Sequence, residues 1–232
     1  MRKRRILAWL VHLYTATGAL LGMFALFAAA QGETRNAFLL LLLAGLVDST
    51  DGILARRARV SEVLPNFSGE QLDNAIDVLT FIWVPIFILV AEDLLPHPSW
   101  IAIPTLAALY AYGQVDMKTP DHFFLGFPSY WNVVALYLYW LRPSGALAVG
   151  MVAVPGLLSF IPTRYLYPSR NGLYSKSIWT LGCLWAALVA FLLLQESPDS
   201  RLVWLSALFP LYYLALSFCL DLQLRRKARR ST

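Results

Sequence analysis

Charged residues are scarce in this sequence of 232 residues: they make up 14% of the chain, whereas 58% of the residues are apolar. Soluble domains contain about 25% charged and 45–50% apolar residues, so the proportions argue against a soluble enzyme and against a disordered chain. The chain has two cysteines, Cys183 and Cys219, both inside apolar runs. Two such residues do not make the framework of a disulfide-stabilised scaffold. The composition predicts a polytopic membrane protein.

Proline- and serine-rich linkers, low-complexity tracts and internal repeats are also missing. The loops between apolar runs are short, which predicts one membrane domain over residues 1–232. The three histidines, His12, His97 and His122, do not stand at the spacing of metal ligands. Their separation argues against a histidine-based metal centre.

Long apolar runs are abundant. A transmembrane helix needs about 20 mostly apolar residues. When short or tilted spans are allowed, eight segments are candidates, of which the fourth to the sixth are short and interrupted: 6–30, 37–54, 72–91, 100–115, 131–141, 146–161, 178–194 and 202–222. We therefore expect an all-α bundle of about eight transmembrane helices.

The basic residues test this count. If the N-terminus is cytoplasmic, 16 of the 19 Lys and Arg residues fall in the inner segments, and Arg35, Arg142 and Arg201 are the three outside. This bias follows the positive-inside rule for an even number of spans, with both termini in the cytoplasm. The basic tail 225–230 is interpreted as an anchor to anionic lipid rather than as a nucleic-acid site.

Four aspartates stand where two adjacent spans meet the cytoplasmic surface. Asp48 and Asp51 are three residues apart near the end of the second span, and Asp73 and Asp77 are four apart near the start of the third. Either spacing places a pair on one helix face. Because the two spans are antiparallel, the pairs lie at similar depth, and four carboxylates near hydrocarbon need a cation. Oxygen ligands favour Mg²⁺, Mn²⁺ or Ca²⁺.

Two other interpretations of these acids are open. A single Asp can cap a helix, and Asp73 suits that role because it lies in a first turn. The four together could also form the ion site of a cation transporter. Transporters place such sites near the middle of the membrane, often in repeated halves, whereas these acids lie at one surface.

Small and basic residues follow the first acidic pair. Gly52 and Ala55 share the helix face of Asp48, where small side chains let a ligand approach the backbone closely. Arg56, Arg57 and Arg59 come next, at the level of lipid phosphates. A metal, a small-residue face and arginines together describe a site for a pyrophosphate that is carried by a lipid.

Read together, residues 48–77 have the pattern D-x2-D-G-x2-A-R-x12-G-x3-D-x3-D. This pattern resembles the signature of the CDP-alcohol phosphatidyltransferases, although the 12-residue gap before Gly69 is longer than in most of that family. The longer gap, the segment VLPNFSGEQLDNAIDVLTF and the later FFLGFPSYWNVV resemble the bacterial members that make phosphatidylcholine.

The resemblance implies a metal-dependent enzyme that condenses CDP-diacylglycerol with choline and releases CMP. It implies that Asp48, Asp51 and Asp73 ligate Mn²⁺ or Mg²⁺, with Asp77 near the metal and acting as general base. Gly52, Ala55, Arg56 and Gly69 match the positions that surround the CDP moiety, together with Asp48. A homodimer and a bacterial inner membrane are also implied, with the active site facing the cytoplasm. Serine, inositol or glycerol phosphate are the alternative acceptors.

Choline carries a quaternary ammonium, which proteins hold against aromatic faces. The segment 121–140 is rich in aromatic residues and starts at the cytoplasmic surface. Phe124, Phe127, Tyr130 and Trp131 are the candidate choline ligands, and an interfacial aromatic belt is the structural alternative. Arg164 and Arg170 lie in a later inner loop as candidate ligands of the lipid phosphate, with plain positive-inside charge as the alternative.

Overall fold

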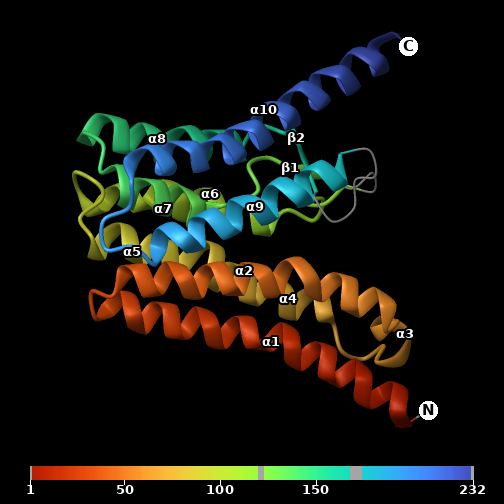
Figure 1. Cartoon of the computed structure of the whole chain (residues 1–232). Coiled ribbons are helices and arrows are strands. Elements are labelled where there is room, and N and C mark those ends of the chain that lie inside the picture. Colours follow the sequence, from red (N-terminus) through yellow and green to blue (C-terminus); the bar gives the residue numbers. More distant parts are fainter. Residues whose placement is uncertain (1, 120–122, 168–173, 231–232) are drawn as a thin grey trace. The chain divides into compact units, whose positions relative to one another are not determined.

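The computed structural model describes residues 2–119, 123–167 and 174–230, and it is almost entirely helical. Its elements (Figure 1) follow in chain order: α1 (Arg2–Ala30), α2 (Thr34–Arg57), α3 (Val60–Val63), α4 (Gly69–Asp77), the π-helical η1 (Val78–Trp83), α5 (Val84–Ala91), the 3₁₀ turn η2 (Pro98–Ile101), α6 (Ala102–Gly113), β1 (Phe123–Leu125), α7 (Trp131–Leu141), α8 (Gly145–Ser159), β2 (Arg164–Leu166), α9 (Ser175–Leu193) and α10 (Ser200–Arg230).

Each of the eight predicted apolar segments contains a helix, although residues 114–115 and 160–161 lie beyond the ends of α6 and α8. Within the described residues, five helical stretches are long and apolar enough to cross a membrane: Arg2–Ala30, Thr34–Arg57, Gly69–Ala91, Lys176–Leu193 and Ser200–Lys227. The prediction of an all-α, multi-pass membrane protein is confirmed at this level. Helices α7 and α8 are apolar but have only 11 and 15 residues. Eight crossings and cytoplasmic termini stay predictions.

The chain divides into two compact units. Unit 1 contains Met1–Leu94 and Trp131–Leu136, and unit 2 contains Leu95–Tyr130 and Tyr137–Thr232. Helix α7 therefore contributes its first turns to unit 1 and its last turn to unit 2. The prediction of one domain over residues 1–232 stays a prediction.

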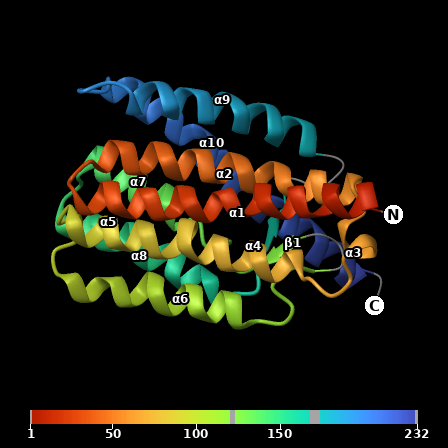
Figure 2. The same cartoon turned by 90° about the horizontal axis from the view of Figure 1, so that it is seen from below.

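In unit 1, α1 lies alongside α2 (Figures 1 and 2) and also contacts α4, η1 and α5. Two glycines on α1 allow its close approach to α4 and η1. A Cβ atom on Gly22 would lie 2.8 Å from Cδ2 of Leu79 and 2.9 Å from Cγ2 of Thr80, and one on Gly18 would lie 3.0 Å from Cγ2 of Ile76. Small residues at such contacts allow helix backbones to pack closely in membranes. Gly18 and Gly22 thus hold α1 against the helix that carries Asp73 and Asp77.

Helix α4 begins at a side-chain cap. The Ser68 hydroxyl accepts a hydrogen bond from the backbone N–H of Gln71 at 3.2 Å, which satisfies one of the free donors of the first turn. The π-helical segment η1 then starts directly after Asp77. Single π-helical turns inside helices are frequent at functional sites, and this one was not predicted from the sequence.

In unit 2, two short strands form a ribbon beside α10. Strands β1 and β2 pair antiparallel, with Phe124 opposite Tyr165. The ring of Tyr165 is fully buried, and it packs edge-on against Phe218 of α10 with 5.6 Å between ring centroids. Helix α10 also contacts α9 and β2. The ribbon is the one sheet within the described residues.

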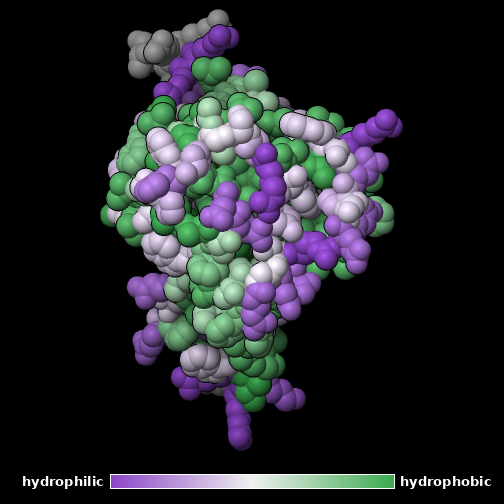
Figure 3. Space-filling view, turned by 90° about the vertical axis from the view of Figure 1, so that its left-hand side faces the viewer, coloured by the Kyte–Doolittle hydropathy of each residue, from purple (hydrophilic) through white to green (hydrophobic). Residues whose placement is uncertain are grey.

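The described surface exposes many large apolar side chains. On α1 alone, Leu13, Leu20 and Phe24 are 64%, 60% and 57% exposed. Hydrophobic side chains form much of the surface visible in Figure 3. Apolar patches larger than a few hundred Å² are rare on soluble monomers, so lipid is the environment that this surface fits.

Candidate active site

Three of the four predicted aspartates come together in unit 1. Asp48 of α2 and Asp73 and Asp77 of α4 each offer a carboxylate oxygen, and these oxygens all lie within 4.8 Å of one another. All three side chains are half-buried. Carboxylate oxygens converging at this separation are a donor set that suits a hard divalent cation. This group is the geometric centre of the candidate site.

Asp51 lies one helical turn from Asp48 and is only 7% exposed. It is not a member of the group of three, so its role as a metal ligand stays a prediction. Between the two aspartates, Thr50 makes a hydrogen bond of 2.8 Å with the Tyr14 hydroxyl of α1. This bond ties α1 to α2 at the level of the carboxylates. Tyr14 was not among the site residues predicted from the sequence.

The candidate CDP ligands on α2 have well-defined surroundings. A Cβ atom on Gly52 would lie 3.2 Å from Nη1 of Arg56, so the guanidinium extends back along the helix over the glycine. Arg56 is exposed and therefore accessible to a phosphate. Ala55 packs against a cluster of α1 and α3 that includes Ala8 and Val60. Its small side chain thus serves packing in addition to any contact with ligand.

Gly69, the fourth candidate CDP ligand, lies at the start of α4 beside α1. A Cβ atom there would be 3.0 Å from Cε1 of His12, which is 5% exposed. The His12 ring also packs on Phe67 at 4.5 Å and on Trp9 at 5.8 Å between ring centroids. This aromatic group was not predicted from the sequence, because its members come from two separate segments, α1 and the loop before α4.

The four candidate choline ligands differ in their surroundings. Trp131 is fully buried and belongs to unit 1, whereas Phe127, which is 5% exposed, and the half-buried Phe124 and Tyr130 belong to unit 2. A box that contains all four rings therefore stays a prediction.

Within unit 2, two candidate rings have aromatic neighbours. Phe124 packs on Tyr167 with 4.7 Å between centroids, and Tyr130 packs edge-on against Tyr213 at 5.8 Å. The ammonium of Lys118 lies 6.0 Å from the Tyr167 centroid. The Lys118 ammonium thus lies beside Tyr167, at the outer limit of a cation–π contact.

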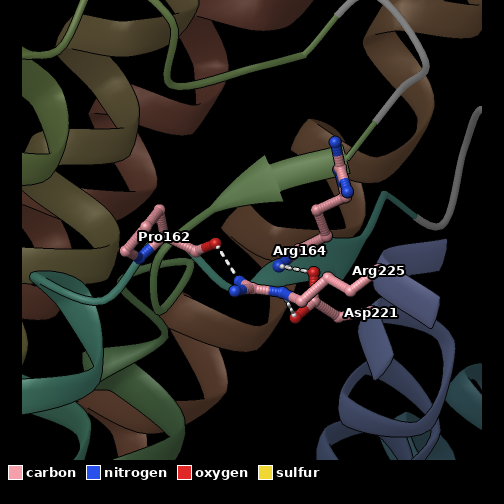
Figure 4. A network of polar contacts seen from close by, with 4 residues as sticks. All are labelled: Pro162, Arg164, Asp221 and Arg225. Carbon is pink, nitrogen blue, oxygen red and sulfur yellow. Dashed lines mark hydrogen bonds and ion pairs between the residues drawn. The ribbon is translucent and has the colours of Figure 1, made fainter. Parts of the chain in front are cut away.

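The candidate lipid-phosphate ligands lie after α8. Arg164 begins strand β2, and its backbone N–H donates to Oδ1 of Asp221 at 3.3 Å. Arg170, like His122, lies outside the described residues. Arg225 pairs with Asp221 at 2.6 Å and donates to the carbonyl oxygen of Pro162 at 2.7 Å (Figure 4). The interpretation of the tail 225–230 as a lipid anchor stays a prediction.

Comparisons with known proteins point to one family. The family described as CDP-alcohol phosphatidyltransferase matches residues 9–162, which include all four aspartates. A phosphatidylcholine synthase of Legionella pneumophila is 36% identical over 91% of this chain and 87% of its own length. Proteins of the same name from Rhizobium johnstonii and Pseudomonas aeruginosa are 38% and 34% identical, over 84% and 96% of this chain and 83% and 92% of their own lengths.

Proposed function

The chain belongs to the CDP-alcohol phosphatidyltransferase family, and from this premise we propose that it transfers the phosphatidyl group of CDP-diacylglycerol to choline. The products are phosphatidylcholine and CMP. The observation that carries the proposal is the convergence of Asp48, Asp73 and Asp77 inside the family motif. The choice of choline rests on the relatives, which are named phosphatidylcholine synthases and align over most of both chains.

The carboxylate group is a fitting site for Mn²⁺ or Mg²⁺. Asp48, Asp73 and Asp77 would hold the ion, with Asp51 as a further ligand at the same end of α2. A bound divalent ion neutralises the pyrophosphate charge and makes the phosphorus more electrophilic. The donor set supports this assignment because oxygen ligands alone favour hard cations.

Asp77 would act as the general base on the acceptor. The choline hydroxyl has a pKa far above 7, so its oxygen needs to lose a proton as it attacks the lipid-side phosphorus. The new bond joins the choline oxygen to that phosphorus, the bond from the phosphorus to the CMP oxygen breaks, and the proton passes to the Asp77 carboxylate. The phosphatidyl group is therefore transferred directly to choline, and no covalent enzyme intermediate forms.

The remaining candidate residues would bind the two substrates. Gly52, Ala55, Arg56 and Gly69 would surround the CDP moiety, and Arg164 and Arg170 would meet the lipid phosphate. Phe124, Phe127, Tyr130 and Trp131 are the proposed choline ligands. The packing of Phe124 on Tyr167 supports this choice, because it provides two adjacent aromatic faces of the kind that hold a quaternary ammonium.

The membrane arrangement follows from the same proposal. Eight spans with both termini in the cytoplasm would place the Asp pairs at the inner surface of a bacterial inner membrane. There the site would face the cytoplasm, which would supply choline and receive CMP. The charge bias of the loops supports this orientation. We also propose that the enzyme forms a homodimer, as the family resemblance implies.

Purified protein in lipid nanodiscs tests the proposal directly. With CDP-diacylglycerol and Mn²⁺ supplied, radiolabelled choline should enter lipid while CMP is released. Serine should fail, because its carboxylate would approach an already acidic site. Incorporation of serine, inositol or glycerol phosphate as efficiently as choline would refute the choline assignment and leave the family chemistry in place.

A further inference from the structure

His12 of α1 carries a buried nitrogen that no hydrogen bond satisfies. The residue is 5% exposed, and within the described part of the chain its Nε2 atom has no hydrogen-bond partner. Burying a polar atom without a partner is costly, and the great majority of such atoms in native proteins are paired. The cost is retained here in unit 1, the unit that holds the carboxylate group. This nitrogen is therefore a candidate ligand of a substrate.

The His12 ring belongs to a group of three, with Trp9 and Phe67, which we call the α1 aromatic cluster. The ring centroids of Trp9 and Phe67 are 5.2 Å apart, and each ring also packs on His12. The same two rings border a cavity of about 480 Å³, whose other lining residues are Arg5, Leu64, Pro65 and Asn66. Small-molecule sites occupy about 300–1,000 Å³. The cluster thus stands beside a space of the size of a ligand site.

The position of His12 along α4 indicates which part of a substrate it can reach. Helix α1 lies beside α4 (Figure 2), and a Cβ atom on Gly69 would be 3.0 Å from Cε1 of His12. Asp73 and Asp77 are four and eight residues further along α4, which is about 6 and 12 Å along the axis. A hydroxyl that reacts at Asp77 is too far for His12 to bind. A nucleotide whose pyrophosphate lies at the carboxylate group has its base at such a distance.

The chemistry of the cluster favours the base over a phosphate. The ring of His12 contacts aromatic side chains and Gly69, and none of these residues is charged. A phosphate needs cationic partners, whereas cytosine is a neutral ring with donors and acceptors in its plane. A neutral imidazole offers one donor and one acceptor. Aromatic side chains also stack on bases.

We propose that His12 binds the cytosine base of CDP-diacylglycerol through Nε2, with Trp9 and Phe67 against the base. This inference rests on the proposed function, and it adds a residue that lies outside the motif of residues 48–77. Because Nε2 is buried, a neighbouring side chain has to move as the base enters from the cavity. Phe67 is the neighbour with the freedom to do so, because it stands in the turn before α4 rather than in a helix.

A matched pair of variants isolates the nitrogen. The side chains in His12→Gln and His12→Met have nearly the same length and shape, but only Gln places a polar group where Nε2 was. CMP is the soluble product and carries the same base, so its Kd is measured by calorimetry on the full chain in nanodiscs with Mn²⁺. His12→Met should weaken CMP binding about fivefold, the effect of one neutral hydrogen bond. His12→Gln should stay within about twofold of wild type, and equal Kd values for the two variants would overturn the proposal.

Thermal unfolding without nucleotide should rank the same two variants in the opposite order. Gln would bury an amide without a partner, whereas the thioether of Met needs none. His12→Met should therefore have the higher Tm although it binds CMP more weakly. A residue that serves packing alone would give no such reversal. If His12→Gln has both the higher Tm and the tighter CMP binding, Nε2 has its partner inside the protein and the proposal is wrong.

Nitrogen NMR observes the proposed bond in the wild-type chain and decides the question even if a variant does not fold. The chain has three histidines, and the ring signals missing from His12→Gln or His12→Met identify those of His12. With Mg²⁺ present, CMP and cytidine should both shift the His12 Nε2 signal, whereas ribose 5-phosphate should leave it in place. A shift with ribose 5-phosphate, or none with cytidine, would contradict binding of the base.

The control and the wild-type assay separate this inference from the proposed function. Leu13→Ala changes the adjacent residue of α1, which is 64% exposed, and should bind CMP as the wild type does. Weakening by Leu13→Ala equal to that by His12→Met would attribute the loss to α1 as a whole, against the proposal. Choline-dependent CMP release by the wild-type enzyme would support the proposed function even if every His12 variant bound CMP normally.

Discussion

Replacing Gly22 with Ala should push α1 away from η1, and the structure sets the size of the effect. The new Cβ atom would lie 2.8 Å from Cδ2 of Leu79 and 2.9 Å from Cγ2 of Thr80, whereas carbon atoms pack best at about 3.5–4.0 Å. Leu79 can turn its side chain away. Thr80 is less free, because its hydroxyl donates to the carbonyl oxygen of Ile76 at 3.0 Å and holds its rotamer.

The expected cost of this overpacking is about 1–3 kcal/mol. Alanine also has a higher helix propensity than glycine by about 1 kcal/mol, which offsets part of that cost. Gly45→Ala is the matched control: it gains the same propensity on α2 and meets no heavy atom within 4 Å. The difference in unfolding free energy between the two variants should therefore equal the overpacking cost. For a chain of this size it corresponds to about 2–12 °C in Tm.

Activity should fall with stability, because η1 starts directly after Asp77. A displacement near 1 Å at a reacting group can cost about 100-fold in rate. Thermal unfolding in detergent and CMP release in nanodiscs would be measured for both variants. If Gly22→Ala matches Gly45→Ala in Tm and in rate, the close approach of α1 to η1 has no part in holding Asp77.

Four other predictions concern the chemistry and the topology. Asp77→Asn should abolish CMP release while CDP-diacylglycerol still binds, since the base is lost and other carboxylates remain; a rate within about tenfold of wild type would exclude this base. Excess EDTA should stop turnover and Mn²⁺ should restore it, whereas activity in the chelator would exclude a divalent ion. Phe124→Ala should raise the choline KM about 2- to 30-fold and leave that for CDP-diacylglycerol nearly unchanged; an unaltered choline KM would remove Phe124 from the choline site. In a cysteine-free background, an impermeant maleimide should label Ser99→Cys but not Ser61→Cys from outside the cell, and the reverse pattern would contradict a cytoplasmic site.

The helices and the acidic group could be predicted because their signals are local. Helix α7 has the bounds that its apolar run predicts, Trp131–Leu141. The spacings of three and four residues put each aspartate pair on one helix face, and the short connection makes α2 and α4 antiparallel. Three of the four carboxylates accordingly meet. Asp51 could not be placed in this way, because helix rotation decides which member of a pair faces the partner helix.

Other features depend on contacts that the sequence does not encode locally. The π-helical turn of η1 lies within the run VLTFIW, whose apolar side chains suit an α-helix equally well. Strands of three residues are too short to show alternation, so the pairing of Phe124 with Tyr165 leaves no pattern. Arg225 stands in a basic tail, but it donates to a backbone oxygen of Pro162, and any residue type supplies such an acceptor.

The hydrogen bonds between α10 and β2 also decide when this part of the protein can be completed during synthesis. The backbone N–H and carbonyl of Leu166 leave the ribosome well before Ser217 and Tyr213, which bind them in the finished protein. Until α10 is inserted, water must satisfy those groups, since hydrocarbon offers no partner. The β2 segment therefore has to stay at the aqueous surface until α10 has been inserted.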